Sequence, residues 1–397
     1  MISKLHINNF KSIKNCEDFE LGRVTVLTGA NNSGKSSFIY SILALKNIIN
    51  NPNQSIDNFL TLPFINLGGF EQTVFDKRKE AAILLGVTII QGKWEIEYYI
   101  NLSPITSLIT LDIKKPFSQS YNLDIAFPYA LNKREEFTLP DGEKSKFIWN
   151  GFAAELKGIH PTLTDLEYSY LFPFQLPVNT FSEVDFVPIR RGFTRPYFGT
   201  IPLQSQISTE EEVATLLALD KELAGKVTFY LEKIVNRSFF VYYTAGTANF
   251  YLQTRDKETG FTSDLVNEGL GTNQLVTILA KVLQGKNKFI CIDEPEIHLH
   301  PTIIDKLVSV LIEISEQEDK QFLISTHSEH FITSILARVA QKEISNEDIR
   351  VYYLNKDGKE TKAELQAINS KGQIEGGLKN FYASEIDNLK NLFKITE

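Results

Sequence analysis

The residues with the clearest chemical purpose form a glycine-rich loop near the start of the chain. Residues 29–36 read Gly-Ala-Asn-Asn-Ser-Gly-Lys-Ser, which is the G-x-x-x-x-G-K-S pattern of a phosphate-binding loop. Glycines let the backbone curl so that its N–H groups point at phosphate oxygens, Lys35 supplies a positive charge, and the Ser36 hydroxyl can ligate Mg²⁺. We expect nucleotide contacts from Gly29, Asn31, Asn32, Ser33, Gly34, Lys35, Ser36 and Ser37.

A second candidate site lies where an apolar run ends in two carboxylates. Residues 289–292 are Phe-Ile-Cys-Ile, and Asp293 and Glu294 follow. Four consecutive apolar residues indicate a strand that is covered on both faces, and open α/β sheets place their sites at the carboxyl ends of such strands. Asp293 is suited to the Mg²⁺ shell, and Glu294 can orient and polarise an attacking water. The alternative is a solvated acidic loop.

A histidine follows a third apolar run. Residues 322–324 are Phe-Leu-Ile, and Ser325, Thr326 and His327 come next. Alone, this histidine would be a strand cap; together with Asp293 and Glu294 it is a candidate contact for the γ-phosphate and the attacking water. Zinc is disfavoured, because the histidine pairs at 298/300 and 327/330 lack a cysteine or carboxylate to complete a ligand set.

The elements that must position these residues can be read from the periodicity of apolar residues. We predict a strand at 23–28, directly before the phosphate loop, and a helix at 36–49 directly after it. Residues 51–70 are expected to be loop, and a single helix is expected from Thr209 to about Ile234. Further strands are predicted at 4–10, 82–90, 94–100, 239–244, 249–254, 288–292, 321–325 and 349–354, and further helices at 272–283 and 301–314. This alternation predicts an α/β fold with a largely parallel sheet.

Composition narrows the class of protein. The 397 residues are 43% hydrophobic and 23% charged, which excludes a fibre and wholesale disorder. The formal charge of −8 does not indicate a nucleic-acid binder, although Arg190, Arg191 and Arg195 leave a local basic patch open. Only two cysteines are present, the start lacks the pattern of a signal peptide, and no apolar run reaches the ~20 residues that cross a bilayer. We therefore expect a cytoplasmic protein with no membrane partner.

Three segments together resemble a known group of ATPases. They are Asn-Phe-Lys-Ser at 9–12, Asp-Glu-Pro-Glu-Ile-His-Leu-His-Pro at 293–301 and Ser-Thr-His-Ser at 325–328. The set is similar to the ABC-type ATPase heads of the RecF/SMC and overcoming-lysogenization-defect (OLD) families, over about 1–100 and 238–397. The resemblance implies an ABC-type P-loop NTPase head with a mixed, largely parallel core sheet and an antiparallel N-terminal β subdomain. The head would comprise 1–104 and 236–397, and 105–235 would be an inserted α+β lobe of unknown role.

The resemblance also implies how nucleotide is held. Such heads dimerise so that ATP, with Mg²⁺, lies between one phosphate loop and the other subunit's signature motif. The matching positions here are Gly271, Thr272 and Asn273, which open a predicted helix but depart from the L-S-G-G-Q pattern of transporters. Gln72 is the candidate for the family's metal-contacting glutamine, with Gln91 as the rival. Lys11 matches a basic residue that lies near phosphate in relatives.

The same resemblance frames the expected partners. About 70 residues follow His327, too few for the Toprim nuclease domain of OLD nucleases, and no sustained heptad run predicts a coiled coil. We therefore expect a homodimer or higher homo-oligomer that controls a separately encoded effector protein, with a nuclease as the expected type. Similar stand-alone ATPases occur in bacterial anti-phage defence modules.

Several functions compete at this point. The first is ATP hydrolysis that drives assembly and gates a partner; the second is an ATP-stabilised sensor or scaffold with little turnover. Glu294 and His327 favour hydrolysis without fixing its rate. The atypical signature and the 105–235 region disfavour a membrane-transporter subunit. A P-loop small-molecule kinase would not need the signature or the histidine-bearing strand.

Overall fold

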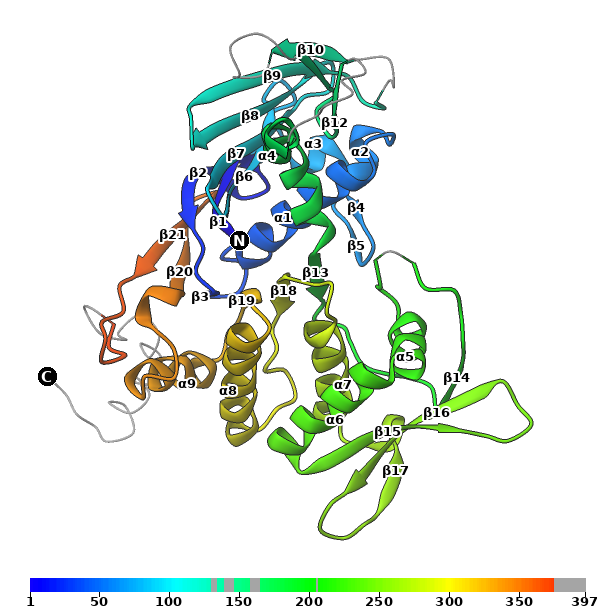
Figure 1. Cartoon of the computed structure of the whole chain (residues 1–397). Coiled ribbons are helices and arrows are strands. Elements are labelled where there is room, and N and C mark those ends of the chain that lie inside the picture. The colour runs from blue at the N-terminus through cyan, green and yellow to red at the C-terminus, as the bar shows by residue number, and fades with distance from the viewer. Residues whose placement is uncertain (130–133, 139–145, 158–164, 205, 375–397) are drawn as a thin grey trace, which may run out of the picture. The chain divides into compact units, whose positions relative to one another are not determined.

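The computed structural model describes residues 1–129, 134–138, 146–157, 165–204 and 206–374, with the backbone alone at 165–170 (Figure 1). The chain forms two compact units. The first comprises Met1–Leu21, Gly34–Val184 and Lys356–Lys362, and the second comprises Gly22–Ser33, Asp185–Asn355 and the residues from Ala363 on. Residues 105–184 thus belong to the first unit and 185–235 to the second, and the inserted lobe at 105–235 stays a prediction. The last part of the expected head, 375–397, lies outside the described residues.

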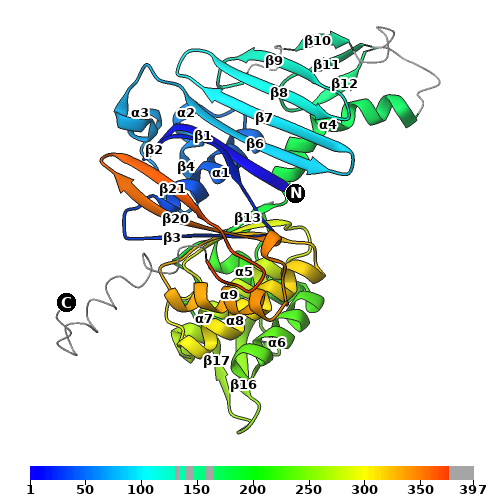
Figure 2. The ribbon, with the colours of Figure 1, turned by 90° about the vertical axis from the view of Figure 1, so that its left-hand side faces the viewer.

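The first unit is built on an antiparallel sheet, as predicted for the N-terminal region (Figure 2). Its strand order is β2 (Ile13–Glu20), β1 (Ile2–Phe10), β6 (Ile83–Gln91), β7 (Trp94–Leu102), β8 (Ser107–Lys115) and β9 (Gln119–Ile125). In β7 the buried residues are Trp94, Ile96, Tyr98, Ile100 and Leu102. This strict alternation is what a sheet with one covered face requires.

Helices and small sheets complete the first unit. Helix α1 (Lys35–Asn50) packs against β1, β6 and helix α4 (Asp165–Ser182). The region 51–70, expected to be loop, also contains α2 (Ile56–Phe59) and the strand pair β4 (Thr61–Leu62) and β5 (Ile65–Asn66), and α3 (Phe70–Thr73) begins at its end. A three-stranded sheet joins β10 (Glu135–Thr138), β11 (Lys146–Trp149) and β12 (Ala154–Leu156). Helix α4 was missed in the sequence because Pro173 and Pro177 lie inside it.

The second unit is centred on the parallel sheet that carries the candidate site. Its strand order is β13 (Val184–Val187), β18 (Phe289–Asp293), β19 (Gln321–Ser325), β3 (Val24–Gly29), β20 (Ile349–Asp357) and β21 (Glu360–Gln366). The pairs β18–β19, β19–β3 and β3–β20 are parallel. All residues of β18 and β19 are buried, which explains their uninterrupted apolar sequences. The predicted parallel core sheet is therefore confirmed.

Five helices contribute to the described part of the second unit: α5 (Glu210–Leu219), α6 (Lys221–Val235), α7 (Leu270–Leu283), α8 (Pro301–Gln317) and α9 (Glu329–Ala340). Their apolar faces share one core with β3, β18, β19 and β20 (Figure 1). The single helix predicted from Thr209 is in fact two helices, α5 and α6, because the helix is interrupted at Asp220. There the Asp220 carboxylate accepts the Leu223 N–H and caps the start of α6.

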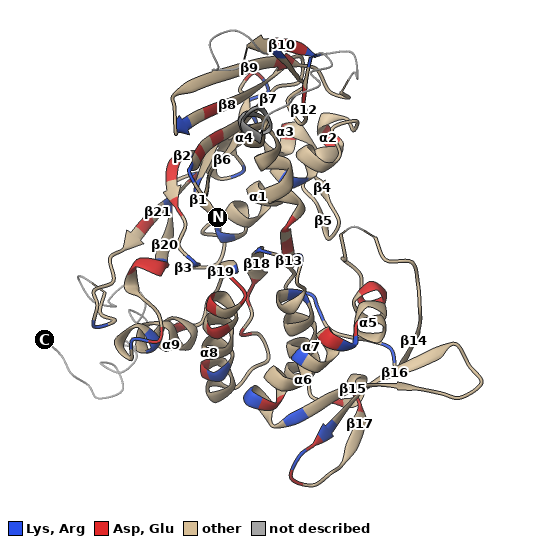
Figure 3. Ribbon diagram, in the orientation of Figure 1, with Lys and Arg blue, Asp and Glu red and all other residues tan. Residues whose placement is uncertain are grey.

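A smaller antiparallel sheet extends the second unit. Its strands are β14 (Tyr197–Gly199), β16 (Asn249–Asp256), β15 (Arg237–Tyr243) and β17 (Thr262–Asp264), of which β15 and β16 confirm the strands predicted at 239–244 and 249–254. Both basic and acidic residues are scattered over the described elements of both units (Figure 3). Across the described ranges, no helix has the length and apolar character to cross a membrane.

Candidate nucleotide-binding site

The phosphate loop follows β3, and two of its glycines are required by its geometry. Gly29 has φ +141°, and a Cβ there would lie 2.1 Å from the Leu354 carbonyl oxygen. Gly34 has φ +103°, and a Cβ there would lie 2.3 Å from Thr361 Oγ1 and 2.9 Å from Ser12 Oγ. No other residue type fits either position. Backbone curled this tightly, without side chains at either glycine, is what a phosphate-holding loop needs.

The loop runs into α1, whose start also suits an anion. Gly34 is the N-cap residue, so no side chain caps the first turn, and that turn contains no acidic residue. Helix N-termini attract phosphate through their N–H groups and the helix dipole. Lys35 and Ser37 are buried, Ser36 is half-buried, and Asn31 and Asn32 are exposed. The residues present therefore fit a bound phosphate chain.

The two carboxylates occupy the end of β18 and the turn after it. Asp293 is opposite Ser325 in the parallel register of β18 and β19, and its buried carboxylate accepts the Ser325 hydroxyl. Glu294 has φ +46°, and its N–H donates to the Ser325 carbonyl at 2.9 Å. This left-handed backbone conformation turns the chain out of the strand direction at Glu294. Glu294 Oε1 lies 3.3 Å from His327 Nε2. The structure thus brings together the three residues that the sequence singled out separately.

The neighbouring strand places the phosphate loop at the same sheet edge. In the register of β19 and β3, Ser325 is opposite Leu27, and the Thr326 N–H donates to the Leu27 carbonyl at 2.9 Å. Since β18, β19 and β3 are parallel, all three carboxyl ends meet there. Gly29–Ser33 therefore leaves β3 beside the Asp293–Glu294–His327 group.

Glu296 and Thr326 support this group, although no role was predicted for either residue from the sequence. Glu296 Oε1 accepts from Thr326 Oγ1 at 2.7 Å and from the His327 N–H at 2.9 Å. Burial raises the pKa of Glu296, and these two hydrogen bonds oppose the rise. The carboxylate thereby fixes the backbone that carries His327. The signal that could have found it is the second acid of Asp-Glu-Pro-Glu, read together with the Thr-His dipeptide.

Arg191 holds the backbone of the turn that carries the two carboxylates. Its guanidinium donates to the carbonyls of Asp293 at 2.8 Å, Glu294 at 2.7 Å and Pro188 at 2.9 Å. Burial lowers the pKa of Arg191 to about 10, and the nearby carboxylates act in the opposite direction, so it stays charged at neutral pH. Arg191 was considered only as part of a basic patch; in the structure it is a positioning residue for the carboxylate turn.

The signature positions open α7. Gly271 and Thr272 are half-buried, and a Cβ on Gly271 would lie 2.8 Å from the His298 carbonyl oxygen. Asn273 differs from the expectation, because its side chain is buried. It accepts the Phe193 N–H at 2.7 Å and donates to the Phe193 carbonyl at 2.9 Å, so it ties α7 to the 188–195 loop and does not face outward.

The two remaining predicted contacts, Lys11 and Gln72, both lie in the first unit. The Lys11 N–H donates to the Thr73 carbonyl at 2.6 Å, which sets it beside α3, and Lys11 Nζ lies 5.7 Å from the Tyr40 ring centroid. Burial lowers the pKa of Lys11. Ser12, the next residue, packs on Gly34. Gln72 is exposed on α3 near Lys11, whereas its rival Gln91 is exposed at the end of β6.

Metal binding by protein groups alone finds no support in the residues that the structure describes. No group of three or more His, Cys, Asp or Glu there could hold an ion. A Mg²⁺ site of the kind expected here differs, because Mg²⁺ needs only one or two protein carboxylates and completes its shell largely with phosphate and water.

Comparisons with known proteins place the chain in a family. Among solved structures it is similar to the SMC head domain from Thermotoga maritima, with 11% identity, a TM-score of 0.46 and coverage of 92% of this chain and 98% of that one. An SMC head bound to the C-winged helix domain of ScpA matches with 11% identity, a TM-score of 0.48 and coverage of 93% and 98%. No curated protein matches the sequence. A family model described as "AAA domain, putative AbiEii toxin, Type IV TA system" matches residues 24–333, which is more than three quarters of the chain. The chain therefore belongs to this AAA-domain family.

Proposed function

We propose that this protein is a Mg²⁺-dependent ATPase with an ABC-type head. The observation that supports this most strongly is the Glu294–His327 pair, with 3.3 Å between Oε1 and Nε2, at the sheet edge where β3 enters the phosphate loop. A carboxylate that can accept a proton from water, beside an imidazole that can contact the γ-phosphate, is the arrangement that hydrolysis needs.

We assign a role to each of the predicted site residues. Backbone N–H groups of residues 29–37 and the Lys35 ammonium would hold the phosphates, with Lys11 as a further cation. Ser36, Asp293 and Gln72 would hold Mg²⁺, which neutralises developing charge on the phosphate oxygens. Glu294 would orient the attacking water and accept its proton late, while His327 would contact the γ-phosphate. Arg191 and Glu296 would fix the backbone of Glu294 and His327.

ATP-dependent assembly is the second part of the proposal. Gly271 and Thr272 at the start of α7 would contact the γ-phosphate bound to a second copy of the chain, so that two ATP molecules join two heads. This assembly would control a separate effector, with a nuclease as the expected type, in DNA-related or anti-phage defence.

Phosphate release by the purified chain tests the enzymatic part. We expect Mg²⁺-dependent turnover that is lost in Lys35→Ala and falls at least about a hundredfold in His327→Ala. The matched control is His330→Ala, because His330 is also exposed and lies one turn away in α9. Equal turnover in the wild type and His327→Ala would contradict the assigned role. ATP binding without turnover in any form, alone or with DNA, would favour the sensor or scaffold function.

A further inference from the structure

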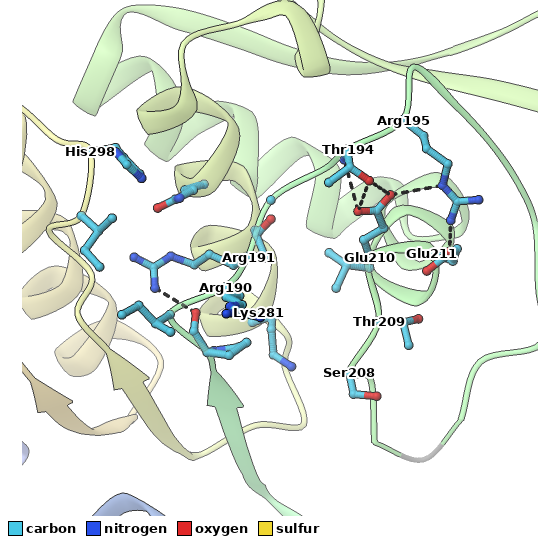
Figure 4. A pocket seen from close by; sticks show the side chains of 17 residues that line it. Arg190, Arg191, Thr194, Arg195, Ser208, Thr209, Glu210, Glu211, Lys281 and His298 are labelled. Atoms are coloured by element: carbon cyan, nitrogen blue, oxygen red, sulfur yellow. Dashed lines mark hydrogen bonds and ion pairs between the residues drawn. The ribbon is translucent and has the colours of Figure 1, made fainter. Parts of the chain in front are cut away.

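A large pocket lies in the second unit (Figure 4), and no residue of the phosphate loop at 29–37 lines it. Its volume is about 790 Å³, within the range of sites for drug-sized ligands. One wall is the 188–195 loop, a second is the middle of α7, and a third is the start of α5. Gln274, Thr277 and Lys281 line it at successive turns of α7, so it lies beyond the signature positions at the start of that helix.

The pocket is positively charged in a chain that is negative as a whole. Its lining contains four cations, Arg190, Arg191, Arg195 and Lys281, and only two carboxylates, Glu210 and Glu211. Arg195 pairs with both carboxylates, and Lys281 pairs with Asp185 at 3.1 Å behind the wall. In the described chain the exposed Arg190 has no ion-pair or hydrogen-bond partner. Its guanidinium is therefore available to an anion, and guanidinium groups bind phosphate by paired hydrogen bonds.

Two buried polar atoms in the same pocket lack partners. Gln274 is 8% exposed and Thr277 is 6% exposed, yet Gln274 Oε1 and Thr277 Oγ1 make no hydrogen bond to any described residue. Such groups cost stability unless something satisfies them. Gln274 Oε1 can only accept, so its missing partner must be a donor. A ligand that satisfies it carries an N–H or O–H group at some distance from its anionic end.

We propose that this pocket binds a nucleoside monophosphate, with the phosphate on Arg190 and the N–H groups of the base facing Gln274 and Thr277. The volume accommodates one such molecule. The hydroxyls of Thr194, Ser208 and Thr209 also line the pocket, but each already donates to Glu210 or Glu212, which leaves Arg190 to hold the phosphate. This inference does not depend on hydrolysis at the phosphate loop.

The 188–195 loop, which forms one wall of the pocket, contacts the turn that carries Asp293 and Glu294. A ligand in the pocket can therefore act on that turn. Arg191, beside Arg190, donates to the carbonyls of Asp293 and Glu294. The same loop is held to α7 by Asn273, which bonds to both backbone groups of Phe193. A ligand that draws this loop toward α7 or away from it would therefore shift the turn that carries Glu294. We infer an effector site rather than a second catalytic site.

Binding to the full-length Lys35→Ala chain tests the proposal without the phosphate loop. Equilibrium dialysis would use AMP, GMP, CMP and UMP, with ribose 5-phosphate and inorganic phosphate as partial ligands. We expect at least one mononucleotide to bind once per chain and both partial ligands to bind at least about tenfold more weakly. Adding Arg190→Gln should weaken binding about tenfold or more. The matched control is Arg255→Gln, another exposed arginine of this unit, which should leave the dissociation constant unchanged.

A second variant, Thr277→Val, tests whether the Thr277 hydroxyl contacts a ligand or is only part of the buried structure. Thr277→Val keeps the side-chain shape and removes the unpartnered hydroxyl, so the free protein should unfold at the same or a higher denaturant concentration. The same variant should weaken mononucleotide binding several-fold. The proposal is overturned if no mononucleotide binds to Lys35→Ala, if Arg190→Gln and Arg255→Gln bind equally well, or if inorganic phosphate binds as tightly as the mononucleotide.

Discussion

Thr326→Val is the sharpest test of how His327 is positioned. Thr326 is fully buried, its hydroxyl donates to Glu296 Oε1 at 2.7 Å, and its oxygen accepts the Ser328 N–H at 2.9 Å. Valine fills the same space, so the variant removes the hydrogen bonds without leaving a cavity. A bond to a carboxylate contributes about 1.5–3 kcal/mol and a neutral bond about 0.5–1.5 kcal/mol. We expect the free energy of unfolding to fall by about 2–4 kcal/mol, as measured by urea denaturation.

The loss should depend on pH. Thr326 stabilises the deprotonated form of Glu296, whose pKa burial already raises, so removing the hydroxyl raises that pKa further. Above the pKa of Glu296 the variant bears a buried charge with one hydrogen bond fewer, and below that pKa the carboxyl is neutral. The stability difference between wild type and Thr326→Val should therefore be largest in alkaline buffer and shrink as the pH falls.

The control is Thr277→Val, because Thr277 is also buried but makes no such bond. It should cost no stability. ATP turnover should also differ between the variants. In Thr326→Val, kcat should fall about tenfold or more with KM nearly unchanged, because the displaced His327 side chain acts on the reacting phosphate. A stability loss below about 1 kcal/mol at neutral pH, or one equal to that of Thr277→Val, would refute the proposed support of His327.

Three further predictions concern Glu296, Lys281 and Gly34. Glu296→Gln keeps an oxygen for the same two donors and removes a buried charge, so we expect a more stable protein at pH 8 and a gain that vanishes as the pH falls, measured by denaturation across pH. Lys281→Met leaves the carboxylate of Asp185 buried without its cation, which should cost about 3–5 kcal/mol, and adding Asp185→Asn should restore most of it. Gly34→Ala places a Cβ 2.3 Å from a hydroxyl oxygen and should lower ATP affinity at least about tenfold, whereas Gly92→Ala, with open space around a positive φ, should not.

The features that could be predicted from the sequence are those determined by residues close together in the chain. The phosphate loop was found because a strand, a glycine-rich loop and a helix follow one another directly, and their order is confirmed. The parallel core followed from the uninterrupted apolar runs of β18 and β19. The strands β6 and β7 were predicted from the two apolar runs at 82–90 and 94–100, whereas the antiparallel sheet was implied by the resemblance. In each case the residues that fix the element are neighbours in the chain.

The supporting contacts could not be predicted, because they join distant segments. Arg191 contacts the carbonyls of residues about a hundred positions later, and Asn273 contacts Phe193 eighty positions earlier. A sequence pattern carries no signal for such contacts, so Arg191 was considered only as surface charge and Asn273 only as a nucleotide contact. The break at Asp220 was missed because the residues on both sides of it favour helix and only the cap reveals the end.

ATP turnover in Glu294→Gln tests the central claim most directly. The substitution keeps the size of the side chain and the contact position beside His327 but removes the proton acceptor. The matched control is Glu316→Gln, an exposed glutamate of α8 far along the chain from the carboxylate turn. We predict that Glu294→Gln binds ATP, loses turnover at least about a hundredfold and accumulates as an ATP-bound assembly of larger mass, while Glu316→Gln behaves as wild type. Undiminished turnover in Glu294→Gln would contradict the account.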